Sequence, residues 1–509
     1  MKPGNLRPGP SVFPVFPSLP VFACMLVAGF AGTMFVARFS SMDGKYAMAS
    51  FLVLGVAAAL LLFHRRLKTI SLILFVIAQG IGAKYYLLTQ HDPLSQHFEH
   101  LEGALAEPVL FLIDFPLALI LALAAYRVFF RKVAPPRWTA LDTAIIVFLA
   151  GSLASLFNAP DKALVVFEIM RYVKYVLGYW ALRVLFSDDT HYGTVMAAIL
   201  CSLGIEALVA VAQYAGGFQL PFFSGGDNGA MTGAFLKTED LARVTGMIGA
   251  CNTFGTWLLF PLGFSGAFLI SKIKRPNKKA IVGMLALGIV TMALTFSRGG
   301  WISLSATGAV LATIAAIQKR FKPSHVTGLV SIIMLCAAAA WLSGVLPLLA
   351  ARVTGDDYGS FQSRPEMNMV GVRMYLDFPL LGGGLNNFQN LSDKYDKTGV
   401  FFNYDVVPHN IFVLIGSETG SIGLLAFIGM GLCILVRAAS LLKKAENEYC
   451  FILGASGTAV LVGIAIANTV DITLRNDLVL AQCSLIAALI MSAKGPPDAS
   501  KTKRKFWNE

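Results

Sequence analysis

The chain has 509 residues, of which 56% are hydrophobic and only 14% are charged, and its net charge is +12. Average soluble domains have about 25% charged residues, so this composition excludes a disordered chain, a small disulfide-stapled protein and an ordinary cytosolic enzyme. It predicts an all-α polytopic membrane protein. In such a protein the excess of Lys and Arg belongs to cytoplasmic loops, so we expect no nucleic-acid partner.

Fourteen apolar stretches are long enough to span about 30 Å of hydrocarbon. They lie near 20–37, 46–63, 69–88, 108–130, 141–157, 162–186, 190–214, 249–271, 279–296, 300–318, 325–346, 409–436, 450–470 and 476–493. The predicted units are a Pro-rich tail (1–19), helices 1–7 (20–214), a loop (215–248), helices 8–11 (249–346), a second loop (347–408), helices 12–14 (409–493) and a basic tail (494–509).

The basic residues predict the orientation of these spans. One set of loops, including both tails, holds 24 Lys and Arg residues, and the loops on the opposite face hold 12. Cytoplasmic loops collect basic residues, so both termini are expected in the cytoplasm. The loops 215–248 and 347–408 then lie on the other face, and long loops in compact membrane domains usually carry function. No internal repeat is visible, which weakens the interpretation as an inverted-repeat transporter.

Four arginines stand out on the face that is poor in basic residues: Arg243, Arg298, Arg364 and Arg373. A single arginine there ordinarily snorkels or binds a carbonyl at a helix end. Four on one face, in or beside long loops, favour a cluster with a shared ligand. A guanidinium group offers a rigid fork of donors that fits phosphate oxygens. We therefore expect a cradle for a lipid-linked diphosphate.

His409 differs from the other six histidines because it stands where the longest loop re-enters the membrane. The charge of a histidine changes near neutral pH, so it can take a proton from a hydroxyl group. A capping or packing histidine explains the same position equally well, and the nearby Tyr404 and Asp405 are alternative bases. The seven cysteines form no CxxC pair, and no cysteine accompanies the histidines at 91, 97 and 100, so no metal site is expected.

Charged residues also occur inside the predicted spans. Glu168, Arg171 and Lys174 share one face of the sixth span, and Glu418 lies nine residues beyond His409, about 13 Å deeper along the helix. Intramembrane charges are costly and are normally paired. Our hypothesis is that Glu418 meets Arg171 or Lys174 beneath the site. A Glu168–Arg171 pair within the sixth span is the alternative.

Four motifs together resemble the superfamily of O-antigen ligases and Wzy-type polysaccharide polymerases, in order and in topology, over residues 240–430. The motifs are Arg243-Val-Thr-Gly246 with Asn252, Ser297-Arg298-Gly299-Gly300-Trp301, Phe378-Pro-Leu-Leu-Gly-Gly-Gly384, and His409-Asn410 followed by Glu418-Thr-Gly-Ser-Ile-Gly423. The first five spans contain no motif that matches this family.

The resemblance implies a GT-C-like helical glycosyltransferase in the bacterial inner membrane, with its active site on the periplasmic face. Such enzymes move a glycan from an undecaprenyl-diphosphate carrier to a hydroxyl of lipid A-core or of another lipid-linked repeat unit, without metal or nucleotide sugar. By this resemblance His409 is the base, Arg298 and Arg364 hold the diphosphate, and Arg243 and Arg373 are further candidates. We assign supporting roles to Asn410, Glu418, Arg171 and Lys174. Membrane lipids and a chain-length regulator or export protein are the other expected partners, and no cofactor is expected.

The reaction expected from the resemblance is a direct, inverting displacement. The outer loops show no carboxylate pair of the kind that glycoside hydrolases use. The number of spans exceeds that of typical ligases and slightly favours a polymerase of O-antigen or exopolysaccharide. Two alternatives stay open. A lipid-linked oligosaccharide flippase would have a repeat, short loops and a central cavity, whereas a non-catalytic scaffold of an export complex would tolerate replacement of His409.

Overall fold

The computed structural model of the chain describes residues 66–86, 109–187, 192–216, 243–273, 278–320, 360–400, 407–443 and 447–493. The predicted spans near 20–37, 46–63 and 325–346 and both tails lie outside these residues. So do most of the loop 215–248, the histidines at 91, 97 and 100, and the alternative bases Tyr404 and Asp405.

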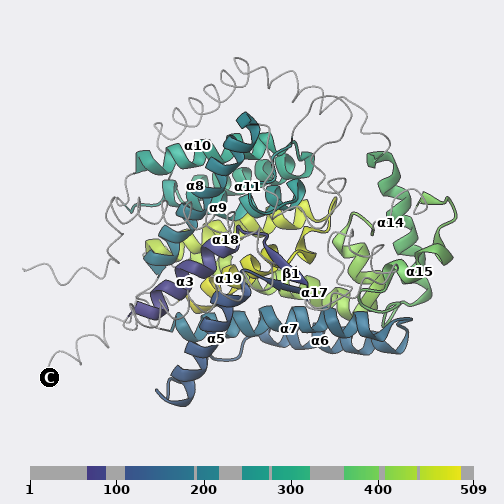
Figure 1. The fold of residues 1–509 in the computed structure, drawn as a ribbon. Coiled ribbons are helices and arrows are strands. Elements are labelled where there is room, and N and C mark those ends of the chain that lie inside the picture. Colours follow the sequence, from purple (N-terminus) through teal and green to yellow (C-terminus); the bar gives the residue numbers. More distant parts are fainter. Residues whose placement is uncertain are drawn as a thin grey trace, which may run out of the picture.

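Helices make up almost all of the described structure (Figure 1). They are α3 (Leu67–Ala78), α5 (Asp114–Phe129), α6 (Ala140–Ala154), α7 (Lys162–Leu185), α8 (Tyr192–Gly216), α9 (Cys251–Ile270), α10 (Lys278–Leu294), α11 (Arg298–Ile317), α14 (Ser360–Asp377), α15 (Phe388–Tyr395), α17 (Ile411–Leu442), α18 (Glu448–Ala467) and α19 (Asp477–Ser492), with short 3-10 turns η2 (Ser155–Phe157) and η4 (Thr473–Arg475). Two short strands, β1 (Lys84–Tyr86) and β2 (Val109–Phe111), pair in antiparallel fashion.

Six helical segments of the described chain are long and apolar enough to cross a membrane. They are Ala140–Phe157, α8, α9, α11, α17 and α18. Each coincides with a predicted span, and α3 and α19 are shorter apolar helices. The chain is therefore a multi-pass helical membrane protein, as its composition predicts.

Two predicted spans contain a strand as well as a helix. The stretch near 69–88 is helical only as far as Ala78, and β1 follows; the stretch near 108–130 begins with β2. Gly80 and Gly82 separate α3 from β1. The amide of Gly82 donates to the carbonyl of Met247 at 2.8 Å, and a Cβ atom at Gly82 would lie only 2.4 Å from the carbonyl oxygen of Ile248. This close backbone contact explains why the helix stops early.

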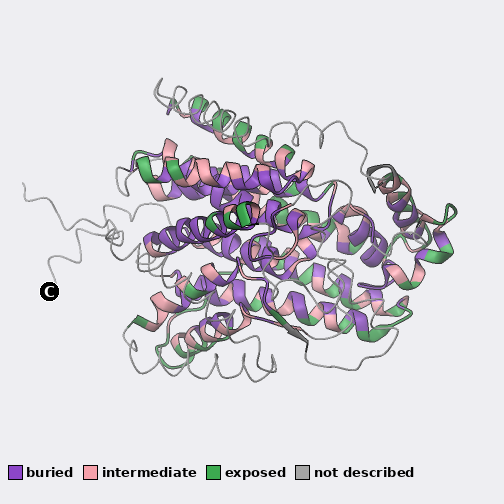
Figure 2. Cartoon of the chain, turned by 45° about the horizontal axis from the view of Figure 1, so that its top comes forward, coloured by how far each residue is buried: buried purple, intermediate pink, exposed green. Residues whose placement is uncertain are grey.

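The core lies where α8, α9, α18 and α19 pack together. Helix α9 contributes four large side chains that are almost fully buried, those of Phe254, Trp257, Phe264 and Phe268. Figure 2 shows the buried residues concentrated in the middle of the bundle. A second apolar cluster joins α14 and α15 to α17 and α7, and it fixes the outer segment against the membrane helices.

The long helix α17 is interrupted at Gly420, whose φ of 63° and ψ of −166° are not helical. Residues 379–384, which carry the Pro-Leu-Leu-Gly-Gly-Gly motif, lie in this break. Four main-chain hydrogen bonds join the two segments: Gly383 N to Ser417 O (2.8 Å), Gly384 N to Glu418 O (3.0 Å), Ser421 N to Pro379 O (2.8 Å) and Ile422 N to Leu380 O (3.4 Å). The backbone groups that the break would leave without partners are thereby satisfied, as a membrane environment requires.

Candidate active site

The candidate site is built around the turn that follows α18. The amide of Ile411, at the start of α17, donates to the carbonyl of Asn468 at 2.9 Å, and the side chain of Asn468 accepts from the amide of Leu474 at 2.9 Å. These bonds fix the turn 468–474 against the beginning of α17. The residue just before α17 is therefore held beside this turn.

His409 faces Asp471 across this junction. Its Nδ1 lies 3.9 Å from Oδ1 of Asp471, which is too long for a hydrogen bond but close enough for an ion pair when the imidazole is protonated. The amide of Ile472 donates to Asp471 at 2.8 Å. Burial raises the pKa of Asp471, but His409 and Arg364 outweigh it and hold the pKa below the ordinary value. Asp471 is therefore a carboxylate at neutral pH.

Asn410 has a structural role in this arrangement. It is the N-cap of α17, and its side-chain oxygen accepts from the amides of Phe412 (3.0 Å) and Val413 (3.3 Å). An N-cap of this kind satisfies amides that have no partner within the helix. Asn410 thus supports the site by holding His409 at the first turn of α17.

Arg364 and Arg298 approach the same turn from two different helices. On α14, Arg364 donates to the carbonyl of Val470 at 2.9 Å, and its buried Nε has no hydrogen-bond partner in the described part of the chain. On α11, a Cβ atom at Gly299 would lie 3.1 Å from the side chain of Val470. The first turn of α11, which begins with the half-buried Arg298, therefore contacts Val470. Arg364 and the first turn of α11 thus both contact Val470, the residue that precedes Asp471.

Arg243 lies next to the start of α11. Its Nε donates to the carbonyl of Thr295 at 3.0 Å, and its Nη2 donates to the side-chain oxygen of Asn252 at 3.0 Å. Ser297 then caps α11 by accepting from the amide of Gly300 at 3.2 Å. The structure thus brings Arg243 to the turn that carries Arg298, as the motif order predicts.

Arg373 occupies a different position from the other three arginines. It donates to the carbonyl of Tyr395 at 3.1 Å and lies 3.9 Å from Glu366. These contacts hold α15 against α14. Arg373 is nine residues from Arg364 on the same helix, which separates them by about 13 Å along its axis. No contact of the described structure joins Arg373 to the Val470–Asp471 turn.

The buried charged residues form a network centred on Arg475, which ends the turn η4 and belongs to none of the sequence motifs. Its Nη1 donates to both carboxylate oxygens of Glu418, at 3.0 and 2.9 Å, and its Nη2 donates to Glu168 at 3.1 Å and to Asn386 at 3.3 Å. The side chain of Arg475 is 2% exposed. It therefore joins η4, the break in α17, α7 and the outer loop at one buried point.

The expected direct contact of Glu418 with Arg171 or Lys174 is wrong. Arg171 binds Glu168 and the carbonyl of Arg475, and Lys174 lies 3.1 Å from Asp477. The alternative, a Glu168–Arg171 pair, is present, but Arg475 also binds Glu168. The expectation was based on the similar depths of Glu418 and Arg171 along their helices. Depth alone could not show that the turn between α18 and α19 brings Arg475 into the bundle. One signal was available, because Arg475 also lies on the face that is poor in basic residues.

A family model described as O-antigen ligase matches residues 282–428. The match supports membership of this chain in the superfamily of O-antigen ligases and Wzy-type polymerases. It confirms the family that the sequence motifs predict, and it suggests a membrane enzyme of the glycosyltransferase type. The matched segment includes His409 and three of the four arginines, whereas Arg243, Asp471 and Arg475 lie outside it. No curated protein matches the chain.

Proposed function

We propose that this member of the O-antigen ligase superfamily transfers a glycan from an undecaprenyl-diphosphate carrier to an acceptor hydroxyl at the periplasmic face of the bacterial inner membrane. One observation carries this proposal. His409 faces Asp471, Arg364 donates to the carbonyl of Val470, and the first turn of α11, which begins with Arg298, packs against the side chain of Val470. A base and two permanent cations at one turn are what such a transfer requires.

His409 would act as the general base. Its buried Nδ1 faces Asp471, so Nε2 is the atom that an acceptor hydroxyl would approach. Nε2 takes the hydroxyl proton while the oxygen attacks the anomeric carbon of the donor sugar. The bond from that carbon to the phosphate oxygen breaks, and its electron pair leaves with the diphosphate. The carboxylate of Asp471 stabilises the imidazolium that forms, and a single displacement inverts the anomeric configuration.

The arginines would stabilise the leaving group. Negative charge grows on the diphosphate as the glycosidic bond breaks, and fixed guanidinium groups favour this charge without reorganisation. Arg364 donates to the carbonyl of Val470, and Arg298 directly precedes the glycine that packs against Val470, so these two are the closest candidates. Arg243 supports them from the turn before α11. In this proposal the arginines supply the charge that a metal ion supplies in other enzymes. Arg373 is assigned to the outer loop, where it would meet the glycan.

Of the two acceptors, we favour another lipid-linked repeat unit, so that the protein acts as a polymerase. The number of predicted spans, which exceeds that of typical ligases, supports this choice over lipid A-core. A chain-length regulator or export protein would then be its partner. The two acceptors leave different products when the enzyme is lost, so one experiment separates them.

The test is the glycan profile of a deletion strain that is complemented with wild type or His409→Ala at equal expression. Single repeats that remain on lipid A or on the carrier indicate a polymerase, whereas long chains that accumulate on the carrier indicate a ligase. We expect His409→Ala to behave like the deletion. A normal profile with His409→Ala would contradict the assignment of the base.

The same strain tests the alternative of a flippase. A transferase leaves its unused carrier-linked repeats on the periplasmic face, where an added glycosidase or periodate can reach them in spheroplasts. A flippase leaves them on the cytoplasmic face, protected from both reagents. Protection of the repeats in the deletion strain would therefore overturn the proposal of glycan transfer.

A further inference from the structure

A pocket lies at the far end of α6 and α7 from the candidate active site. At the near end, the side chain of Asn158 donates to the carbonyl of Gly382 at 2.8 Å, which attaches the α6–α7 connection to the outer loop. At the other end, Arg183 on α7 binds Asp142 on α6 at 3.0 Å. The 24 residues of α7 cover about 36 Å, which is enough to separate the two ends by a membrane.

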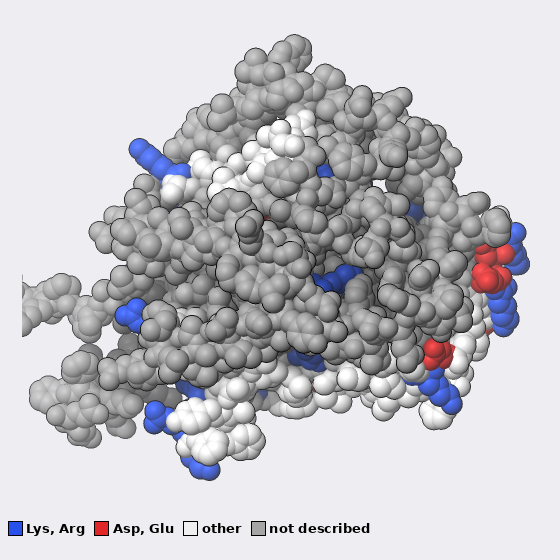
Figure 3. Space-filling model, in the orientation of Figure 1, with Lys and Arg blue, Asp and Glu red and all other residues white. Residues whose placement is uncertain are grey.

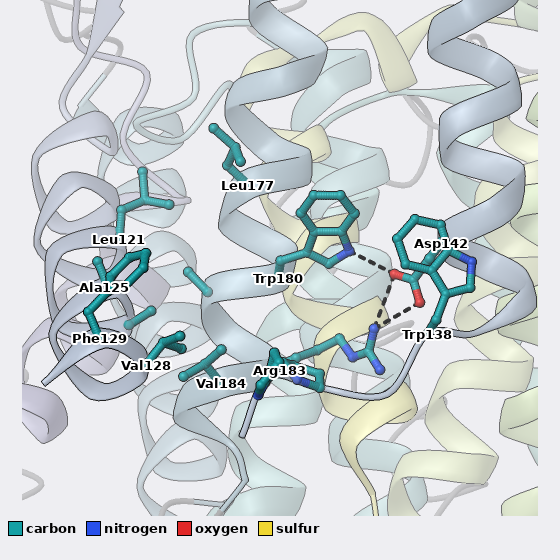
Figure 4. A pocket seen from close by; sticks show the side chains of 14 residues that line it. Leu121, Ala125, Val128, Phe129, Trp138, Asp142, Leu177, Trp180, Arg183 and Val184 are labelled. Carbon is teal, nitrogen blue, oxygen red and sulfur yellow. Dashed lines mark hydrogen bonds and ion pairs between the residues drawn. The ribbon is translucent and has the colours of Figure 1, made fainter. Parts of the chain in front are cut away.

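The pocket has a volume of about 370 Å³ and lies between α5, α7 and the connection 130–139 (Figure 4). This volume falls within the range of about 300–1,000 Å³ that small-ligand sites occupy. Most of its lining is hydrocarbon. The residues that matter for its shape are Leu121, Ala125, Phe129, Trp138, Leu177 and Val184.

Most polar groups in the pocket wall bind one another, and Nε of Arg183 has no hydrogen-bond partner in the described part of the chain. Asp142 accepts from Nε1 of Trp180 at 2.7 Å and from Arg183, and Arg183 also donates to the carbonyl of Arg137 at 2.6 Å. One carboxylate is thus matched by one guanidinium. The interior carries no net charge, so it favours an apolar ligand.

The rim of the pocket is positively charged. The connection that forms it carries Arg131, Lys132 and Arg137, all exposed, and the sequence has no acidic residue between positions 115 and 141. Basic side chains are visible over this end of α5 in the space-filling view (Figure 3). Trp138 is 63% exposed beside them, and tryptophan favours the boundary between hydrocarbon and water.

We propose that this pocket binds one acyl chain of an anionic glycerophospholipid, with the lipid phosphate held by Arg131, Lys132 and Arg137. The apolar interior fits the chain, and the basic rim fits the phosphate. The rim belongs to the loops that the distribution of Lys and Arg assigns to the cytoplasm, and anionic lipids give that leaflet its negative surface. The site is separate from the proposed glycan-transfer site, so its ligand is a resident lipid of the membrane.

The experiment is native mass spectrometry of the full-length protein in detergent, with phosphatidylglycerol or phosphatidylcholine of identical acyl chains added. We expect the wild type to retain phosphatidylglycerol preferentially. Arg131→Ala/Lys132→Ala should weaken this binding about 25-fold, because each basic residue near an anionic surface contributes about fivefold. The matched control Lys319→Ala/Lys443→Ala removes two exposed charges outside the pocket and should bind like the wild type.

A second pair of variants fills the pocket without touching its charges. Ala125→Trp and Leu177→Trp both start from exposed positions on the pocket wall, so the bundle should still fold, as thermal unfolding would show. Each should lose the preference for phosphatidylglycerol while the rim stays intact. Retention of phosphatidylglycerol at the wild-type level by both filled variants would overturn the proposal. Equal retention of the two lipids by the wild type would also overturn it, because it would indicate only the lipid layer around any membrane protein.

Discussion

At the scale of single residues, the most informative contact is that between His409 and Asp471. The carboxylate is 9% exposed and keeps its charge because His409 and Arg364 face it. Nδ1 of His409 and Oδ1 of Asp471 lie 3.9 Å apart, which is too far for a hydrogen bond. Their interaction is therefore electrostatic, and neutralising Asp471 tests it.

Asp471→Asn should lower the rate of glycan transfer. A neutral amide stabilises the imidazolium that forms at His409 less well than a carboxylate does. The Asp471 carboxylate also makes the stability of the protein depend on pH. Because the folded state lowers the pKa of Asp471, its carboxylate contributes stability above about pH 4, and this contribution disappears as the pH falls further.

Rates measured at neutral pH with a carrier-linked donor would show this loss. The difference in stability between wild type and Asp471→Asn should narrow below about pH 4. Equal rates in the two proteins would contradict an electrostatic role for Asp471 in the reaction, and the residue would then serve only as a part of the turn.

At the scale of elements, the break in α17 is the feature that shapes the site. Gly420 combines a positive φ with a ψ that only glycine adopts without strain, and a Cβ atom there would lie 2.3 Å from the backbone of Leu380. The break exposes backbone groups of α17 that form hydrogen bonds with residues 379–384. It also places Glu418 directly before the interruption, where Arg475 binds it.

Gly420→Ala should destabilise the protein by at least about 1–3 kcal/mol from backbone strain alone, and it should push residues 379–384 out of the break. The rate of glycan transfer should also fall, because residues 379–384 follow directly after α14, the helix that carries Arg364. The matched control is Gly431→Ala on the same helix, where a Cβ atom would meet nothing within 4 Å. Equal unfolding temperatures for the two variants would show that the break tolerates a side chain.

The sequence predicts the apolar membrane helices well, but it does not predict where tertiary contacts interrupt them. Apolar runs indicate α8, α9 and α18 well, because a membrane helix needs only length and hydrophobicity. The early end of α3 and the break at Gly420 both depend on a glycine that meets a distant backbone, and spacing along the chain does not contain that information. The Gly416–Gly420 step has the form of a helix-packing motif, yet in the structure Gly420 ends a helical segment.

The candidate site follows a similar division. The motifs name Arg243, Arg364 and His409, and short turns and helix ends hold Arg243 beside the start of α11 and the other two at the Val470–Asp471 turn. Asp471 and Arg475 escaped the sequence analysis because a turn between two spans carries no motif. Their contribution arises only when α18 packs against α17 and α9.

At the scale of the whole molecule, Arg475 is the point through which the separate parts of the bundle are connected. Glu168, Glu418 and Asn386 come from α7, α17 and the outer loop, and all three bind this one side chain. Removal of one partner of a buried ion pair leaves an uncompensated charge, which is more costly than loss of an exposed pair. The stability of the fold should therefore be sensitive to a single neutralising change.

Glu418→Gln should destabilise the protein by about 3 kcal/mol and lower both the folded yield and the activity. Asp377→Asn is the matched control. It removes the Asp377–Lys394 pair, whose side chains are 52% and 63% exposed, so its effect should be much smaller. Thermal unfolding and yield in the same detergent measure both. Unchanged yield and activity in Glu418→Gln would show that Arg475 needs only Glu168.

The main-chain bonds between residues 379–384 and 417–422 have a mechanical consequence. Because they are backbone bonds on both sides of the break, the outer segment and the helix beneath it move as one body. If the chain is cleaved at the exposed Lys397, the two fragments should therefore stay associated, because these hydrogen bonds join residues on opposite sides of the cleavage point. The protein should then behave as a non-covalent complex of two fragments that purify together.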